Sequence, residues 1–341
     1  MPRPSPPGLD LDRLDAWLPT AIPGAGPVEG AELIAGGKSN LTYTVTDGTS
    51  HWILRRPPLG HVLATAHDMG REFRVMSALQ DSAVPVPRMY AMCTDDSVIG
   101  APFYVMSKVE GVPYRSAIEL EALGQTRTRM ISERLVDVLA DLHEIDPAAV
   151  GLADFGRADG FLTRQLNRWN KQLHSSYSRP LPAADKLFAE LAADIPVQGA
   201  GGIVHGDYRL DNVLVDANDR PAAVIDWEMA TLGDPVTDLA LMLIYDRLGV
   251  SAAESAVTNV SSAPGYLTES EVVERYSARS SRDLARIGWY LGLASYKLAV
   301  IVEGIHFRFI QGQTVGSGFD HLGDAVNVLL EAGLNSMKEY R

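Results

Sequence analysis

The sequence predicts an α+β fold with two lobes: an N-lobe built on an antiparallel sheet with one helix, and a larger, mainly helical C-lobe. Short strand-like runs separated by turn signals fill the first part of the chain, whereas long helical patterns dominate after Gly111. The 341 residues, 46% of them hydrophobic, suffice for two cores. We therefore place the N-lobe at residues 1–107, a connection at 108–111 and the C-lobe at 112–341.

The N-lobe elements follow from caps, turns and strand-forming residues. Asp10 precedes leucines at helical spacing, which predicts a short opening helix. The dipeptide Asp47-Gly48 between two strand-like runs predicts a hairpin. The expected strands are residues 32–34, 41–46, 51–54, 85–96 and 101–109, and the expected helix is 68–79.

The C-lobe is expected to be mostly helical. The expected helices are residues 127–143, 183–193, 237–248, 269–279 and 282–310, and two strand-like runs lie at 213–215 and 222–225. The most apolar stretch, residues 288–305, is interrupted by Lys297 and Glu303 and is shorter than a comfortable membrane span. We therefore expect a buried helix there and no membrane partner.

Charge and cysteine content narrow the classes of partner. The formal net charge of −13 repels a polyphosphate backbone, and no lysine or arginine cluster reverses this locally, so we expect no nucleic acid partner. The first eight residues, MPRPSPPG, lack the apolar core of a secretory signal. The single cysteine, Cys93, cannot form an internal disulfide, which suits a reducing compartment. Together these features favour the cytoplasm.

The strongest chemical signal is IVHGDYRLDNVLVD, followed by AAVIDWEMA. Asp207 and Asn212 are separated by four residues and Asp226 follows after another strand-like run, which is the arrangement of a phosphoryl-transfer loop. In that chemistry a carboxylate orients the acceptor hydroxyl, and oxygen ligands hold the Mg²⁺ that bridges the ATP phosphates. Each residue alone would favour an ordinary turn or strand end, where Asp and Asn are common, but the joint pattern favours phosphotransfer.

Many segments of the chain resemble one known family. They are GGKSNLTYTV, WILRRPP, REFRVMSAL, VPVPRMY, PFYVMSKVEG, LADLH, VHGDYRLDN, IDWEMATLGDPVTDLA and SYKLAVIVEGI. The chain resembles the aminoglycoside phosphotransferase family of kinase-like enzymes, and within it the kinase-like domains found beside acyl-CoA dehydrogenase domains. The resemblance implies a two-lobe protein-kinase-like fold, with residues 108–111 as the hinge and with ATP and Mg²⁺ bound between the lobes.

The resemblance also implies roles for the loop residues. Asp207 would be the catalytic base, and Asn212 and Asp226 would be the magnesium ligands. His205 would anchor the loop, and Asp238 would brace its backbone.

The N-lobe would supply the nucleotide contacts. In GGKSN, Gly37 would let backbone N–H groups approach the phosphates, and Ser39 and Asn40 would add side-chain donors. This segment lacks GxGxxG, and a plain β-turn is the alternative interpretation. The backbone groups of Ser107 to Val109 would pair with adenine.

Arg55 departs from the family pattern. It stands where the family usually has a strand lysine that contacts the α- and β-phosphates, and Glu72 stands where the ion-pair partner of that lysine would be. A guanidinium is bulkier and differently aimed than an ammonium, so Arg56 and Lys38 are alternatives for the phosphate contact. For Glu72 the alternative is a surface charge on an amphipathic helix.

Two further departures concern the acceptor. Arg209, in the YRLD stretch of the loop, would place a cation beside the acceptor site and suit a carboxylate or phosphate group on the acceptor. Pairing of Arg209 with Asp211 is the alternative. Asp226 is followed by Trp227-Glu228 instead of the Phe-Gly of protein kinases, which argues against a protein substrate.

We therefore predict an ATP-dependent phosphotransferase that moves the γ-phosphoryl group of Mg·ATP to a small-molecule hydroxyl. The motifs do not choose among an acyl-CoA-linked hydroxyl, another metabolite and an aminoglycoside as the acceptor. The alternative is a non-catalytic, nucleotide-binding regulatory module of the same fold, for which Arg55 is the sequence support. The oligomeric state stays open.

Overall fold

The computed structural model describes residues 5–34, 40–60, 68–250, 259–314 and 322–340. The chain divides into two compact units, Met1–Gly111 with Ala222–Ala230, and Val112–Pro221 with Thr231–Arg341. Residues 222–230, which are expected in the C-lobe, pack with the first unit. The Val224 N–H, for example, donates to the Pro85 carbonyl at 2.8 Å. Asp226 therefore belongs to the first unit.

The first unit is built on an antiparallel sheet. Its strands are β1 (Gly30–Leu33), β2 (Leu41–Thr46), β3 (His51–Arg56), β4 (Met89–Cys93) and β5 (Phe103–Ser107), in the spatial order β1-β2-β3-β5-β4. The predicted hairpin at Asp47-Gly48 is confirmed, because Thr46 pairs with His51 across it. Asp47 Oδ1 accepts the Ser50 N–H at 2.6 Å. Gly48 has a φ of +82°, which glycine adopts without strain.

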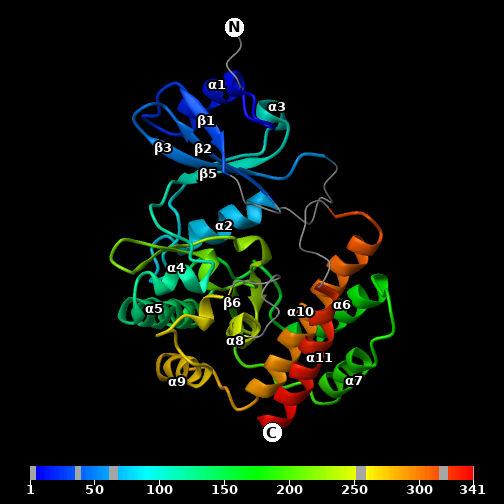
Figure 1. The fold of residues 1–341 in the computed structure, drawn as a ribbon. Coiled ribbons are helices and arrows are strands. Elements are labelled where there is room, and N and C mark those ends of the chain that lie inside the picture. The colour runs from blue at the N-terminus through cyan, green and yellow to red at the C-terminus, as the bar shows by residue number, and fades with distance from the viewer. Residues whose placement is uncertain (1–4, 35–39, 61–67, 251–258, 315–321, 341) are drawn as a thin grey trace. The chain divides into compact units, whose positions relative to one another are not determined.

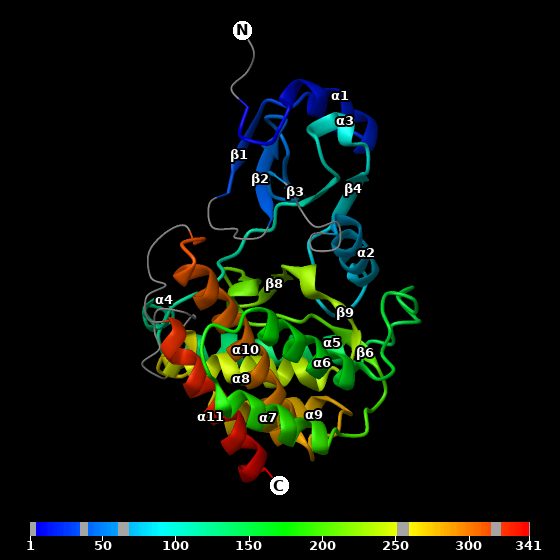
Figure 2. The ribbon, with the colours of Figure 1, turned by 90° about the vertical axis from the view of Figure 1, so that its right-hand side faces the viewer.

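The described helices of the first unit are α1 (Leu11–Ala21), α2 (Met69–Leu79) and α3 (Asp96–Ile99). Asp10 caps α1 as expected, and Asp68 caps α2, each accepting the N–H three residues later. Helices α1 and α3 lie side by side, and α2 contacts β4 and β5 (Figures 1 and 2). The strand expected at 85–96 ends at Cys93, because Asp95 accepts the Ser97 N–H at 2.8 Å and starts α3.

The second unit is mainly helical in its described part. Its helices are α4 (Ala117–Glu121), α5 (Gln125–Glu144), α6 (Phe161–Ser175), α7 (Pro182–Ala193), α8 (Val236–Val250), α9 (Glu269–Arg279), α10 (Ile287–Ile310) and α11 (Leu322–Glu339). Two of these, α4 and α11, are absent from the sequence predictions. The buried helix expected at 288–305 is confirmed as α10, whose side chains from Ile287 to Tyr296 are all buried.

Helices α10 and α11 run side by side in close contact (Figure 1). A Cβ atom on Gly288 of α10 would lie 2.7 Å from the Ser336 carbonyl oxygen of α11. A Cβ atom on Gly333 of α11 would lie 3.0 Å from Ser295 Cβ of α10. Glycine at these positions therefore permits the close approach of the two helices.

Short strands lead into and out of the predicted catalytic loop. Strand β6 (Gly202–Val204) pairs antiparallel with β9 (Thr231–Gly233), and the loop follows β6 directly. A 3₁₀ turn, η1 (Leu210–Asn212), leads into β7 (Val213–Val215), and β8 (Pro221–Val224) comes next along the chain. A tight turn joins β7 to β8, since the Asp216 N–H donates to the Arg220 carbonyl at 2.8 Å.

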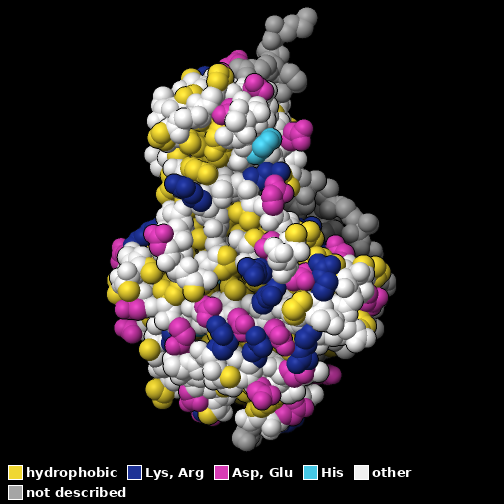
Figure 3. All heavy atoms as spheres, turned by 90° about the vertical axis from the view of Figure 1, so that its left-hand side faces the viewer, with side chains coloured by type: hydrophobic (Ala, Val, Ile, Leu, Met, Phe, Trp, Pro, Cys, Tyr) yellow, Lys and Arg dark blue, Asp and Glu magenta, His cyan; other side chains and the backbone are white. Residues whose placement is uncertain are grey.

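Charged side chains of both signs are interspersed on the face of the second unit seen in Figure 3. Ion pairs link α5 and α9, with 2.7 Å between Arg275 Nε and Asp137 Oδ1 and 3.0 Å between Arg279 Nη2 and Asp141 Oδ1. Acidic side chains on these helices are thus partly neutralised by neighbouring arginines. Within the described ranges, no helix combines the length and the apolar character needed to cross a membrane.

Candidate active site

The predicted catalytic loop is fastened to helix α8 by one buried carboxylate. Asp238, in the first turn of α8, accepts the His205 N–H at 2.6 Å and the Gly206 N–H at 2.8 Å. Burial alone would raise the pKa of Asp238, but its hydrogen bond to His143, the charges of His143 and His205 and the Gly206 N–H outweigh burial and lower it. Asp238 is therefore an anion that braces the loop, which is the role that the resemblance implies.

His143, late on α5, belongs to the same brace. Its Nδ1 lies 2.7 Å from the Tyr276 hydroxyl, and its Nε2 lies 3.5 Å from Asp238 Oδ2. The ring is fully buried, and burial lowers the pKa of His143 despite the neighbouring carboxylate. His143 is therefore a packed residue of this brace.

Asp207 has both carboxylate oxygens oriented by neighbours within the second unit. Asn212 Nδ2 lies 3.1 Å from Asp207 Oδ2, and the Tyr245 hydroxyl donates to Asp207 Oδ1 at 3.0 Å. Asn212 Nδ2 also donates to the backbone carbonyl of Asp207 at 2.8 Å. Because the amide nitrogen of Asn212 makes both bonds, the amide oxygen is the atom that could meet a cation. Tyr245, 38 residues further along the chain, gives no sequence signal for this role.

Arg209 is engaged by carboxylates of its own loop. Its Nη2 lies 2.7 Å from Asp211 Oδ2, and its Nε lies 3.6 Å from Asp207 Oδ2. The guanidinium also stacks on Tyr245, 4.7 Å from the ring centroid. The pairing with Asp211 that the sequence leaves open is therefore present, and Arg209 is less available to an acceptor than the sequence suggests.

Arg55 is the centre of a second cluster, which lies entirely in the first unit. Its Nη2 lies 2.6 Å from Asp226 Oδ1 and 3.9 Å from Glu228 Oε2, and its Nε lies 3.2 Å from Glu72 Oε2. The predicted pairing of Arg55 with Glu72 is thus present as an ion pair. The contact with Asp226 is an addition, because it joins residues 171 positions apart that the sequence does not connect.

Glu72 is buried among hydrogen-bond donors and is not a surface charge. Tyr104 donates its hydroxyl to Glu72 Oε2 at 2.8 Å, and Asn40 Nδ2 donates to Glu72 Oε1 at 3.1 Å. Burial raises the pKa of Glu72 to about 7, although Arg55 and Tyr104 act to lower it. Asn40 Nδ2 also lies 3.2 Å from Glu228 Oε2, so Asn40 links the two carboxylates.

Asp226 has an unusual backbone conformation. Its φ is +67°, in the left-handed region that residues other than glycine rarely adopt. The 3₁₀ turn η2 (Trp227–Met229) follows at once, and Trp227 Nε1 donates to the Val224 carbonyl at 3.0 Å. The turn directs the carboxylates of Asp226 and Glu228 toward the same guanidinium.

A metal ion held by these carboxylates would have to be of a type that takes its remaining ligands from phosphate and water. Among the described residues, no group of three or more His, Cys, Asp and Glu side chains is arranged to hold a metal ion. Mg²⁺ is typically held by one or two carboxylates together with phosphate oxygens and water, rather than by a complete protein cage. The partly exposed carboxylates of Asp226 and Glu228 in the first unit are oxygen donors of that kind, and so is the amide oxygen of Asn212 in the second unit.

The remaining predicted nucleotide contacts are only partly described. Gly37 and Ser39, with the alternative Lys38, lie outside the described residues. Ser107 ends β5, and its Oγ accepts the Arg88 N–H at 2.9 Å. Val109 lies in the irregular segment that follows and is half-buried.

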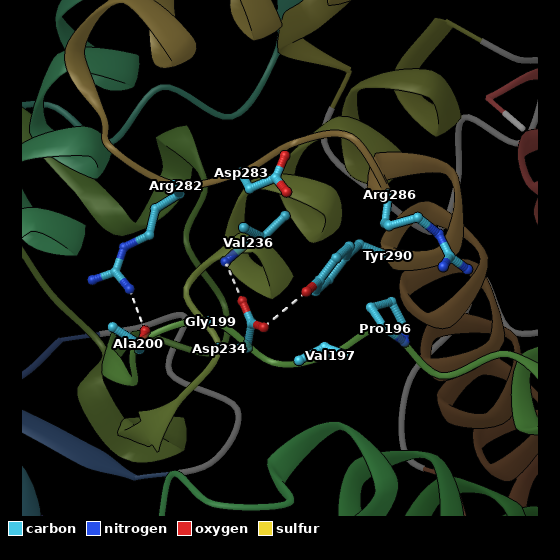
Figure 4. Close-up of a pocket in the computed structure, with 10 residues that line it drawn as sticks. All are labelled: Pro196, Val197, Gly199, Ala200, Asp234, Val236, Arg282, Asp283, Arg286 and Tyr290. Carbon is cyan, nitrogen blue, oxygen red and sulfur yellow. Dashed lines mark hydrogen bonds between the residues drawn. The ribbon is translucent and has the colours of Figure 1, made fainter.

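The second unit also has a small pocket of about 130 Å³ away from these residues (Figure 4). It is lined by Pro196, Val197, Gly199, Ala200, Asp234, Val236, Arg282, Asp283, Arg286 and Tyr290. The Tyr290 hydroxyl donates to Asp234 Oδ2 at 2.8 Å. Arg282 donates a hydrogen bond to the Ala200 carbonyl, and Arg286 donates one to the Asp194 carboxylate. None of the predicted site residues lines this pocket.

Comparison with known sequences identifies relatives over nearly the whole chain. The profile of the phosphotransferase enzyme family matches residues 30–271. Acyl-CoA dehydrogenase family member 11 of Rattus norvegicus is 32% identical over 335 residues, which cover 96% of this chain and 43% of the relative. Acyl-CoA dehydrogenase family member 10 of Mus musculus is 31% identical over 86% of this chain and 28% of the relative. The chain thus spans less than half the length of these relatives.

Solved structures match the fold. A candidate aminoglycoside phosphotransferase from Ralstonia eutropha JMP134 is 31% identical with a TM-score of 0.86, covering 97% of this chain and 98% of that one. A thermostable mutant of an aminoglycoside phosphotransferase, in ternary complex with AMP-PNP and hygromycin B, is 16% identical with a TM-score of 0.60 over 95% and 98% of the two chains. The second likeness concerns the fold alone, and together they confirm the predicted kinase-like α+β fold class.

Proposed function

Because this chain belongs to the phosphotransferase enzyme family, we propose that it transfers the γ-phosphoryl group of Mg·ATP to a hydroxyl of a small molecule. The family predicted from the motifs is confirmed by the profile match and by the relatives. The observation that carries the proposed activity is the Asp207 carboxylate, held at both oxygens by Asn212 and Tyr245 on a loop that Asp238 braces.

Asp207 is the proposed catalytic base. Its carboxylate accepts a hydrogen bond from the acceptor hydroxyl and takes the proton late in the reaction. The acceptor oxygen bonds to the γ-phosphorus while the bond from that phosphorus to the β–γ bridging oxygen breaks, and ADP leaves with the electron pair. Asn212 and Tyr245 keep the carboxylate from rotating away from the acceptor, which is a positioning contribution.

Asn212, Asp226 and Glu228 are the proposed ligands of Mg²⁺. Bound Mg²⁺ supplies neutralisation of the charge on the phosphate oxygens. Glu228 is an addition to the two ligands predicted from the sequence, and it is supported by its approach to the guanidinium that also binds Asp226.

Arg55 is the proposed phosphate contact on the nucleotide side. A guanidinium can donate two parallel hydrogen bonds to phosphate oxygens, and Arg55 is the described cation closest to Asp226. Without nucleotide, its charge is neutralised by Glu72 and Asp226. With nucleotide, we expect the phosphates to replace the Asp226 carboxylate, which frees that carboxylate for the metal.

For the acceptor we propose three groups of compounds, in the order in which they should be tested. The relatives are named for acyl-CoA dehydrogenation, so hydroxylated acyl-CoA compounds are the first acceptors to test. Other hydroxylated metabolites come next, and aminoglycosides follow because fold neighbours act on them. The decisive experiment is a screen of these three groups for acceptor-dependent release of ADP. If the protein binds ATP in a Mg²⁺-dependent way but releases no ADP with any of the three groups, the proposed transfer is contradicted.

Substitution of Asp207 tests the base directly. Asp207→Asn keeps the shape of the side chain but removes the proton acceptor, so we expect kcat to fall by about 10²–10⁴-fold with little change in ATP affinity. ADP release and calorimetric ATP binding measure the two quantities. Asp185→Asn, the same change at an exposed position on α7, is the control and should leave both unchanged. Near-normal turnover by Asp207→Asn would remove Asp207 from its assigned role.

A regulatory module that binds nucleotide without turnover is the second candidate. The short contact between Arg55 and Asp226 favours it, because the guanidinium occupies a carboxylate that a metal would need. The two candidates differ in one measurement, since the module would bind ATP yet release no ADP with any acceptor.

A further inference from the structure

Lys297 is a charged residue in the middle of a buried apolar helix. Its neighbours on α10, Tyr296 and Leu298, are 0% and 4% exposed, and Lys297 itself is only partly exposed. An ammonium group in such surroundings costs free energy unless polar or anionic partners compensate for the lost hydration. In the sequence Lys297 argues only against a membrane span, and it has no role in the proposed reaction.

The ammonium group reaches the predicted catalytic loop. Lys297 Nζ donates to the Gly206 carbonyl at 2.8 Å and lies 5.6 Å from the centroid of the Trp169 ring on α6. Burial lowers the pKa of Lys297, and the negative charges of Asp207 and Asp238 offset that effect only in part. The hydrogen bond to the predicted catalytic loop, and not contact with solvent, therefore accounts for the ammonium group at this position.

Gly206 is the residue immediately before Asp207, and its backbone is held on both sides. Its N–H donates to Asp238 Oδ1 at 2.8 Å, while its carbonyl accepts from Lys297. The next N–H, that of Asp207, donates to His205 Nδ1 at 3.2 Å. The planar peptide unit between Gly206 and Asp207 is thus fixed at its oxygen by Lys297 and at its nitrogen by His205.

This peptide unit is also one that could rotate easily. Gly206 has a φ of +88°, a conformation that glycine adopts freely, and glycine offers no side chain to resist a change of its ψ angle. Rotation of the peptide would move the Cα of Asp207 and with it the carboxylate. A hydrogen bond from α10 to the carbonyl is a direct restraint on that rotation.

We infer that Lys297 is a positioning residue for Asp207: it locks the Gly206–Asp207 peptide so that the carboxylate points at the acceptor hydroxyl. The inference rests on the proposed function in naming Asp207 as the base. The restraint itself stands on the hydrogen bond to Gly206 and does not depend on which acceptor is used.

The test compares Lys297→Met with Lys297→Arg. Methionine keeps an unbranched chain of similar length but donates no hydrogen bond, so we expect kcat to fall by about 10- to 100-fold with an unchanged KM for ATP. Arginine keeps a cationic donor and should restore part of kcat. ADP release is measured with the best acceptor of the screen, or with water where no acceptor turns over. Lys186→Met, at an exposed site on α7, is the matched control and should behave as wild type.

Two kinetic outcomes overturn the inference. One is a kcat for Lys297→Met within twofold of wild type. The other is equal loss of kcat and of ATP affinity in Lys297→Met and Lys297→Arg, which would indicate a general structural role. Thermal unfolding shows whether Lys297→Met folds. Where it does not, the kcat values of Lys297→Arg and Lys297→Gln decide. A fall in kcat with unchanged KM for ATP in either variant supports the inference, whereas wild-type kcat and KM in both variants overturn it.

A crystal structure and amide hydrogen exchange of Lys297→Met separate this inference from the proposed function. We expect the Gly206 carbonyl to change direction and the Asp207 N–H to exchange faster than in wild type. An unchanged peptide orientation with unchanged exchange overturns the inference, even where wild type shows full activity. Conversely, a rotated peptide in a protein without phosphotransfer would support the restraint while contradicting the proposed function.

Discussion

Arg55 and Arg56 are adjacent in sequence yet have different environments, because successive side chains of a strand point to opposite faces of the sheet. Arg55 points at the carboxylates of Glu72 and Asp226. Arg56 is buried and donates to the backbone carbonyls of Gly8 and Ile99. The phosphate contact that the sequence leaves open between them therefore stays a prediction for Arg55, while the role of Arg56 is structural.

Removal of the Arg55 guanidinium should weaken nucleotide binding. Loss of a hydrogen bond to a charged group costs about 1.5–3 kcal/mol, so we expect Arg55→Ala to lower the affinity for AMP-PNP by about 10- to 100-fold. Isothermal titration calorimetry in excess Mg²⁺ measures the affinity. Arg88→Ala, at an exposed position just before β4, is the control. Unchanged affinity in Arg55→Ala would move the phosphate contact to Lys38.

Glu72 should make the stability of the nucleotide-free protein depend on pH. Burial raises the pKa of Glu72 to about 7 from an ordinary value of 4.5, so the folded state binds a proton more tightly than the unfolded chain. The favourable contribution is complete below pH 4.5 and is lost as pH rises through about 7. Glu72→Gln lacks this titration.

The measurement is thermal unfolding of wild type and Glu72→Gln between pH 5 and pH 8, in steps of about half a unit. The difference in Tm should shift in favour of Glu72→Gln as pH rises, whatever its value at pH 5, because other groups titrate equally in both proteins. A constant difference across this range would mean that Glu72 has no raised pKa.

At the scale of elements, the contact between α10 and α11 depends on glycine. A Cβ atom on Gly288 would lie 2.7 Å from the backbone oxygen of Ser336 and 2.8 Å from Tyr340 Cβ, and a backbone atom cannot move aside cheaply. We expect Gly288→Ala to lower the free energy of unfolding by about 1–3 kcal/mol. Urea unfolding followed by circular dichroism measures it.

Gly304, further along α10, is the matched control for Gly288. A Cβ atom there would meet its nearest neighbour, Ser176 Oγ, at 3.8 Å, which is an ordinary contact. Alanine is favoured over glycine in a helix interior by about 1 kcal/mol, so Gly304→Ala should be neutral or stabilising. Equal effects of the two substitutions would show that helix propensity, and not the approach of α11, decides the result.

The predictions of helices and turns are confirmed where residues close together in the chain signal them. The cap at Asp10 and the turn at Asp47-Gly48 involve residues within a few positions of each other, and both are confirmed. Helix α10 begins at Ile287 instead of residue 282, because Asp283 Oδ1 accepts the Ala285 N–H in a local turn before the helix. Helices α4 and α11 are absent from the prediction although their apolar residues recur at helical spacing, so more complete use of periodicity could have found them.

At the scale of the whole molecule, the proposed ligands come from two units. Asn212 belongs to the second unit and Asp226 to the first. If both act on one Mg²⁺, their contributions to nucleotide binding cannot be independent, since loss of either ligand already weakens the shared site.

A double-mutant cycle tests this shared role. We expect Asn212→Ala and Asp226→Asn each to reduce Mg²⁺-dependent affinity for AMP-PNP, and the double variant to lose less than the sum of the two by about 0.5–3 kcal/mol. Calorimetry with and without Mg²⁺ supplies the affinities, and the magnesium-free values are the control. Strictly additive losses would assign the two residues to separate sites.

The sequence by itself determined the fold class and the family, and it predicted Asp207, Asn212 and Asp226 as the residues of phosphotransfer. These follow from local patterns, in which a residue and its signal lie close together in the chain. The tertiary structure alone decided that Asp226 packs with the first unit beside Arg55, and that Tyr245 and Lys297 reach the loop around Asp207. Such contacts join residues dozens of positions apart, and they exist only because packing of whole helices and strands brings the side chains together.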